Sequence, residues 1–113
     1  GWRAFFHRGT TLLLMGCFEK ARRPLERAEW TRSTPEGSNN LGVALSMAGE
    51  TLQATICFES ALKRFPGYLD AGINITSELP ARITPHPLRV LPSRRDYGAE
   101  SIEHIAEAGK LLG

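Results

Sequence analysis

The sequence is poor in cysteine, and this scarcity excludes two classes of small protein. Only two cysteines occur among the 113 residues, Cys17 and Cys57, and they form no Cys-x-x-Cys pair. A disulfide scaffold and a structural zinc site are therefore both poorly supported. At this length the chain holds a single domain, and its 42% of hydrophobic residues is enough for a packed core.

Long apolar runs and a secretion signal are also missing. The longest uncharged stretch near the start, Gly9 to Phe18, spans ten residues, whereas a transmembrane helix needs about 20. No charged start, apolar run and small-residue cleavage site follow one another in order. We therefore expect a reduced, cytoplasmic chain with no membrane partner.

No excess of charge of one sign is present, but the charge is patterned. Residues 1–35 hold seven basic and three acidic side chains, and residues 36–79 hold two basic and five acidic ones. Four arginines of the first part are candidates for contact with phosphates: Arg22, Arg23, Arg27 and Arg32. Because neither interleaved aromatic residues nor a nucleic-acid-binding motif accompanies them, a solvated face is favoured and no nucleic-acid partner is expected.

The sequence contains no constellation of catalytic residues. No glycine-rich phosphate loop follows a strand pattern, and the three histidines fall in three different parts of the chain. His104 lies at helical spacing from Glu100, Glu103 and Glu107, which suits either a metal site or the solvated face of a helix. The solvated face is favoured. We expect no enzyme, no cofactor and no metal.

What the sequence does have is an internal repeat. An offset of 33 residues aligns six pairs of identical residues, namely Gly9 with Gly42, Leu12 with Leu45, Gly16 with Gly49, Ala21 with Ala54, Glu26 with Glu59, and Ala28 with Ala61. A period between 20 and 50 residues is typical of a repeat array. An ordinary three-helix bundle with accidental repetition is the alternative.

Each copy has the pattern of two helices joined by a tight turn. Apolar residues three and four apart predict a helix over 40–48, which Gly49 ends. A second helix follows and carries Phe58 and Ala61. Gly42 has no side chain, so one of these two residues can approach the first helix closely. The fold class that we predict is an all-α array of antiparallel helix hairpins.

These residues resemble the tetratricopeptide repeat. The second copy carries its motif at Leu41, Gly42, Leu45, Ala54, Phe58, Ala61 and Pro66, and the first at Phe5, Gly9, Leu12, Ala21, Leu25 and Ala28. The first copy departs from the family in having Arg8 where leucine is usual, and Pro24 inside its second helix, where we expect a kink. Its period is also one residue shorter than the 34 of the family.

The resemblance divides the chain into two and a half repeats and a tail. We expect repeats over residues 2–34 and 35–68, a partial repeat over 69–79, a proline-rich connector over 80–95 and a capping helix over 96–112. The prolines rule out a regular helix or a central strand in the connector, which we expect to be extended. Asp96 is the predicted N-cap of the last helix, which we expect to dock on the repeats.

This resemblance implies a protein-interaction module, in which the first helices of successive repeats line a groove for a peptide or a partner helix. The positions that correspond to the groove are Arg3, Phe6, His7, Thr10, Leu13, Glu36, Asn39, Asn40, Val43, Met47, Asp70, Ile73, Asn74 and Ser77. Asn40 and Asn74 occupy positions where the family often places an asparagine that hydrogen-bonds the ligand backbone in both directions. The alternative for both is a solvated helix face.

Two expectations about partners follow from the resemblance. An acidic chaperone C-terminus, which one branch of the family binds, should not bind here, because Asp70 stands where that branch has a positive charge. The alternative to peptide binding is a structural role, in which the uncovered end of a short array pairs with a second copy to form a homodimer.

Overall fold

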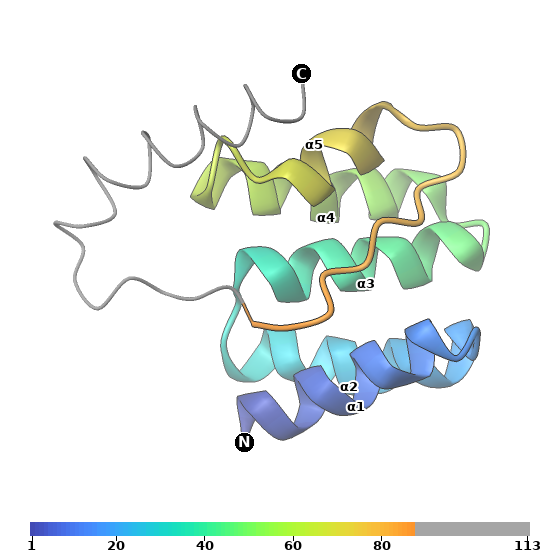
Figure 1. Ribbon diagram of the computed structural model, residues 1–113, viewed down its shortest axis with the longest axis vertical. Coiled ribbons are helices and arrows are strands. Elements are labelled where there is room, and N and C mark those ends of the chain that lie inside the picture. The colour runs from blue at the N-terminus through green and yellow to red at the C-terminus, as the bar shows by residue number, and fades with distance from the viewer. Residues whose placement is uncertain (88–113) are drawn as a thin grey trace, which may run out of the picture.

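The computed structural model describes residues 1–87, which form five helices and a final irregular segment (Figure 1). The helices are α1 (Trp2–Leu14), α2 (Phe18–Thr31), α3 (Pro35–Met47), α4 (Thr51–Arg64) and α5 (Leu69–Thr76). Within residues 1–87 there is no strand. The predicted capping helix over 96–112 and residues 88–95 of the connector lie outside the described residues.

The helices pack as hairpins in chain order. The closest packing joins α1 to α2 and α3 to α4, while α2 against α3 and α4 against α5 connect one hairpin to the next. Helix α3 also contacts α1 and α5, so the first helices of successive hairpins are neighbours (Figure 1). The predicted all-helical array of hairpins is confirmed.

Two glycines end the first helices of the hairpins by the same backbone geometry. Gly16 and Gly49 each have a φ of +81°, in the left-handed region that other residues rarely adopt. The N–H of the residue after each glycine donates to a carbonyl five residues earlier, at 2.8 Å and 2.9 Å. This pairing satisfies carbonyls at the helix end and turns the chain back into the second helix.

A continuous apolar core runs through the two hairpins. Its buried members are Leu13, Ala21, Leu25, Val43, Ala44, Leu45, Ala54 and Phe58. A smaller cluster of Ala61, Tyr68 and Ala71 joins α4 to the start of α5. Burial of the shared small residues explains why the repeat keeps alanine at these positions.

The start of α3 is held by side chains from two elements. Thr34 caps the helix, and its Oγ1 accepts a hydrogen bond from the Gly37 N–H at 3.1 Å. On α2, the Glu29 carboxylate accepts from the hydroxyls of Ser38 at 2.6 Å and Ser33 at 3.0 Å, and from the Thr34 N–H at 3.2 Å. Glu29 thereby fixes the junction between the first and second hairpins.

Pro24 lies inside α2 without ending it. A proline inside a helix removes one N–H donor and brings its ring against the preceding turn. The helix nevertheless continues for seven residues beyond the proline, to Thr31. The hairpin packing of α2 against α1 and α3 therefore tolerates this departure from the repeat pattern.

Candidate functional site

The chain itself lies across the first helices of the array. After α5 it turns back, and residues 80–87, orange in Figure 1, run in an extended path across α3. Residues 82–84, which we call the docked segment, hydrogen-bond to side chains of α3 and α5. The site is therefore built from two helix faces and the segment that occupies them.

Asn40 of α3 holds the backbone of Thr84 in both directions. Its Oδ1 accepts from the Thr84 N–H at 2.9 Å, and its Nδ2 donates to the Thr84 carbonyl at 2.9 Å. The other hydrogen of the same amide goes to the Thr10 hydroxyl of α1, also at 2.9 Å. Since Asn40 is fully buried, it is not a solvated surface residue.

Asn74 of α5 holds the backbone of Arg82 in the same way. Its Oδ1 accepts from the Arg82 N–H at 2.9 Å, and its Nδ2 donates to the Arg82 carbonyl at 2.9 Å. Alternate residues of an extended chain present their N–H and C=O groups on the same side. Two asparagines on neighbouring first helices therefore match residues i and i+2 of an extended backbone.

Asn39 completes this network from beside Asn40. Its Nδ2 donates to the Arg82 carbonyl at 2.8 Å, and its Oδ1 accepts from Asn74 Nδ2 at 2.8 Å. The Arg82 carbonyl thus accepts two hydrogen bonds, one for each lone pair. Asn39 both contacts the segment and orients the amide of Asn74.

The side chain of Thr84 enters a polar cluster at the start of α5. Its hydroxyl donates to Asp70 Oδ2 at 2.7 Å and hydrogen-bonds with the Tyr68 hydroxyl. A longer contact of 3.5 Å joins it to Asn39 Nδ2. Only 4% of Thr84 is exposed, so this threonine is as buried as a core residue.

Tyr68 serves this cluster as a neutral donor. Burial raises the pKa of its hydroxyl well above the usual value, and the carboxylates of Asp70 and Glu36 act in the same direction. The hydrogen bond with Thr84 has a smaller, opposite effect. The hydroxyl of Tyr68 therefore keeps its proton at neutral pH.

The other two side chains of the docked segment also have partners. Arg82 Nε lies 3.3 Å from Asp70 Oδ1, so the two oxygens of Asp70 serve two different residues of the segment. Ile83 is partly buried and packs against the core cluster that includes Val43. The three consecutive residues thus present a basic, an aliphatic and a hydroxyl side chain.

The structure places the residues of the predicted groove in three groups. Buried ones are Phe6, Thr10, Leu13, Glu36, Asn39, Asn40, Val43 and Asn74; Asp70 is half-buried; and the exposed ones are Arg3, His7, Met47, Ile73 and Ser77. Among them, Asn39, Asn40, Asp70 and Asn74 bond the docked segment directly. Thr10 accepts a hydrogen bond from the Asn40 amide and so orients it, while Leu13 and Val43 belong to the core.

Sequence reasoning missed Tyr68 and left open whether the connector occupies the groove. Tyr68 precedes α5 and lies just outside the predicted groove positions. Thr84 lies 44 residues from Asn40, and no periodic pattern connects the two. The aliphatic Ile83, between Pro80 and Pro85, is a weak signal that this part of the connector packs on the array.

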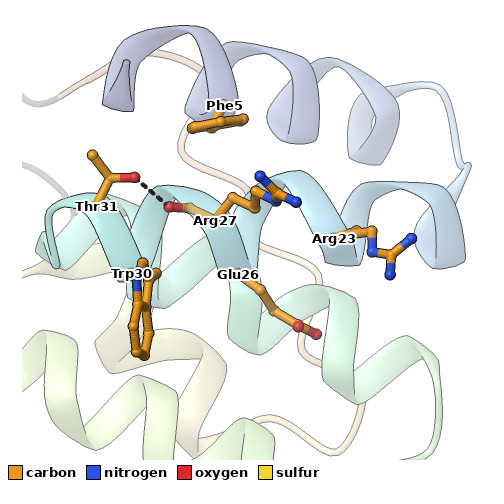
Figure 2. Close-up of a pocket in the computed structure, with 6 residues that line it drawn as sticks. All are labelled: Phe5, Arg23, Glu26, Arg27, Trp30 and Thr31. Carbon is orange, nitrogen blue, oxygen red and sulfur yellow. Dashed lines mark hydrogen bonds between the residues drawn. The ribbon is translucent and has the colours of Figure 1, made fainter.

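A second surface feature is the basic outer side of the first hairpin. Figure 2 shows a pocket lined by Phe5 of α1 and by Arg23, Glu26, Arg27, Trp30 and Thr31 of α2. The guanidinium of Arg27 lies 6.0 Å from the centre of the Phe5 ring, and that of Arg32 lies 5.9 Å from the Trp2 ring. Two of the four candidate arginines thus contact aromatic rings of their own chain.

A third arginine of this side is engaged by carboxylates. Arg22 forms ion pairs with Glu26 at 2.7 Å and with Glu50, which immediately precedes α4 in the second hairpin, at 2.9 Å. Its side chain joins the two hairpins at the surface, where such pairs contribute little to stability. The basic side therefore has an intramolecular role at several of its positions.

Two absences apply to residues 1–87 only. No helix there is long and apolar enough to cross a membrane. No three histidine, cysteine, aspartate or glutamate side chains of this part lie close enough to hold a metal ion. His104 and its neighbouring glutamates lie outside the described residues.

Comparisons of the chain with protein-family models, with curated proteins and with solved structures give no match.

Proposed function

We propose that this protein is a non-catalytic interaction module whose first helices bind an extended peptide segment of a partner protein. One observation carries the proposal: Asn40 and Asn74 each donate to and accept from the backbone of one residue, and those two residues are i and i+2 of an extended chain. Recognition through the backbone suits a peptide of a partner, because every peptide offers the same N–H and C=O groups.

The docked segment occupies this site in the chain described here. It is joined to α5 by only a few residues, so its effective concentration at the site is on the order of millimolar. A partner peptide at micromolar concentration therefore competes poorly until the docked segment is released. The proposed site is consequently closed in the free protein, and a binding assay must first open it.

The test uses a variant of the full chain in which the docked segment is weakened and the site is intact. Arg82→Asp/Thr84→Asp, called the opened variant below, places two carboxylates beside Asp70, so the segment is repelled. A fluorescent peptide of residues 80–87 with the unchanged sequence is then titrated, and its anisotropy is measured. We expect saturable binding to the opened variant and much weaker binding to the unchanged chain.

The matched control carries Asn40→Ala in the opened variant. Loss of both backbone hydrogen bonds to one residue should weaken binding by about tenfold or more. Circular dichroism confirms that each variant keeps its helices. If a helical opened variant bound no peptide up to millimolar concentration, the proposed function would be wrong.

Self-association is the second candidate, and the exposed apolar residues around α5 favour it. Leu69 and Ile73 are 37% and 38% exposed, and Leu79 after the helix is 81% exposed. Such residues at the end of an array are suited to pairing with a second copy. Light scattering of the full chain decides between the two: a dimer that dissociates on Ile73→Glu/Leu79→Glu supports assembly, and a monomer excludes it.

A further inference from the structure

The docked segment shows which side chains the site accepts as well as how it holds a backbone. Arg82 and Thr84 both reach Asp70, which lies in the first turn of α5. Asparagine–backbone bonds carry no sequence information, so any preference must come from these side-chain contacts. Because the segment fits the site with both its backbone and its side chains, it serves as an example of a ligand.

We propose that Asp70 and Tyr68 are specificity-determining residues that select partner segments with a threonine or serine hydroxyl two residues after a basic side chain. This inference rests on the proposed function, since it concerns the same site. It adds the chemical class of the ligand: an extended Arg/Lys–aliphatic–Thr/Ser segment of a partner protein.

The site selects a hydroxyl because Asp70, Tyr68 and Asn39 together use both the donor and the acceptor capacity of that hydroxyl. The Thr84 O–H donates to Asp70, while its oxygen accepts from the Tyr68 hydroxyl and, at longer range, from Asn39. A valine of the same shape would leave the buried hydroxyl of Tyr68 without this acceptor and the half-buried Oδ2 of Asp70 without this donor, and the penalty is larger than the loss of one exposed hydrogen bond. Serine keeps the hydroxyl and loses only a methyl group.

The basic side chain is selected by the remaining oxygen of Asp70. Its Oδ1 faces Arg82 Nε, and about half of the Arg82 side chain stays exposed. The contribution of this ion pair is therefore smaller than that of the buried hydroxyl, and salt screens it. An acidic residue at either position would meet the Asp70 carboxylate and be rejected.

The experiment compares a panel of peptides of residues 80–87 on the opened variant. The peptides carry the unchanged sequence, Thr84→Ser, Thr84→Val or Arg82→Ala, and anisotropy gives the dissociation constant of each. We expect the serine peptide to bind within a few-fold of the unchanged one. The valine peptide should bind about tenfold or more weakly, and the alanine peptide a few-fold more weakly, with the latter difference shrinking in high salt.

A matched protein variant assigns the selectivity to Tyr68. Tyr68→Phe in the opened variant removes one hydroxyl and keeps the ring, so it should weaken the threonine peptide and leave the valine peptide nearly unchanged. Asp70→Asn should likewise reduce the ratio of the dissociation constants of the Arg82→Ala and unchanged peptides, because the amide carries no charge. Only this ratio is compared, since Asp70→Asn also removes the repulsion that opens the site and so affects both peptides alike.

The outcomes separate this inference from the proposed function. If all four peptides bind the opened variant equally and Asn40→Ala still abolishes binding, the backbone site is real and the selectivity is wrong. If no peptide binds, the proposed function itself fails. A threonine–valine difference that persists unchanged in Tyr68→Phe would overturn the role of Tyr68.

Discussion

The ring of Phe58 on α4 lies directly against the backbone of Gly42 on α3. A Cβ atom placed on Gly42 would stand 2.5 Å from Cε1 of this ring, closer than real Cβ contacts allow. The first hairpin repeats the arrangement, since a Cβ on Gly9 would stand 2.5 Å from Cγ of Leu25. One glycine per hairpin therefore sets the distance between its two helices.

Gly42→Ala should destabilise the protein by about 1–3 kcal/mol, because the added methyl group forces Phe58 or a helix to move. Gly72→Ala is the matched control. A Cβ on Gly72 meets nothing within 4 Å, so this change should be neutral or stabilise α5 by about 0.5–1 kcal/mol. Urea denaturation followed by circular dichroism measures both, and equal effects of the two substitutions would contradict the assigned packing.

Asn74→Ala should release the docked segment. The Arg82 N–H would lose its acceptor and the Arg82 carbonyl one of its two donors, at a cost of about 1–3 kcal/mol. Hydrogen exchange of the Arg82 and Thr84 amides reports the release directly, because both are protected by asparagine side chains in the folded chain. Exchange that is fast already in the unchanged protein would show that the segment does not stay docked.

Stability should fall at alkaline pH, in part through Cys57. Partial burial raises the pKa of its thiol to about 11, and the Glu29 carboxylate acts in the same direction. The unfolded chain ionises this thiol near pH 9, whereas the folded chain resists ionisation, so the stabilising contribution present below pH 9 is lost as the pH rises toward 11. Cys57→Ala should flatten this part of the pH profile in thermal melts, and Cys17→Ala controls for removal of a thiol. A profile that Cys57→Ala leaves unchanged would argue against this cause.

Acidic C-terminal peptides of the kind that some helical-repeat proteins bind should not compete for the site. A terminal carboxylate placed over α5 would meet Asp70, whose oxygens already accept from Arg82 and Thr84. In the opened variant, an acidic peptide should fail to displace the labelled peptide of residues 80–87. If an acidic peptide displaced the labelled peptide at micromolar concentration, and Asn40→Ala abolished this displacement, the expectation would be wrong.

Glu29→Gln should loosen the junction between the hairpins. Glutamine replaces one acceptor oxygen by an NH₂ group, which cannot accept from Ser38 or Ser33. We expect a loss of about 1–2 kcal/mol in the free energy of unfolding, since hydrogen bonds to a carboxylate are stronger than neutral ones. Combining Ser33→Ala/Ser38→Ala with Glu29→Gln should then add little to this loss, and additive effects would mean that the contacts act separately.

The helices could be predicted from the sequence because their signals are local. The pairs Gly16/Gly49 and Gly9/Gly42 mark a turn and a close packing position in each hairpin, and both requirements follow from the absence of a side chain. Pro80 likewise indicates that the helix of the partial third repeat is short, and this helix, α5, ends at Thr76. Periodicity and turn chemistry were sufficient for this part of the fold.

Of the site, the asparagines of the helices could be predicted from the sequence, but the segment that they bind could not. The resemblance to the tetratricopeptide repeat implied that Asn40 and Asn74 occupy positions where an asparagine bonds a ligand backbone, and this made a backbone-binding pair foreseeable. Their occupant was not foreseeable, because the contact between Asn40 and Thr84 spans 44 residues and depends on where an irregular connector turns. Nor does any pattern reveal that Tyr68, ahead of α5, points its hydroxyl at the same threonine.

The docked segment also changes how the array should unfold. In a linear array each repeat touches only its neighbours, so the ends can fray independently of the middle. Here the chain of bonds from Thr10 through Asn40 to Thr84, and from Arg82 to Asn74, connects all three first helices. Loss of any one helix therefore removes bonds from the other two, and unfolding becomes a single cooperative event. Release of the segment with nothing in its place would leave a protein that unravels in stages, whereas a partner peptide that makes the same bonds would keep the three first helices connected.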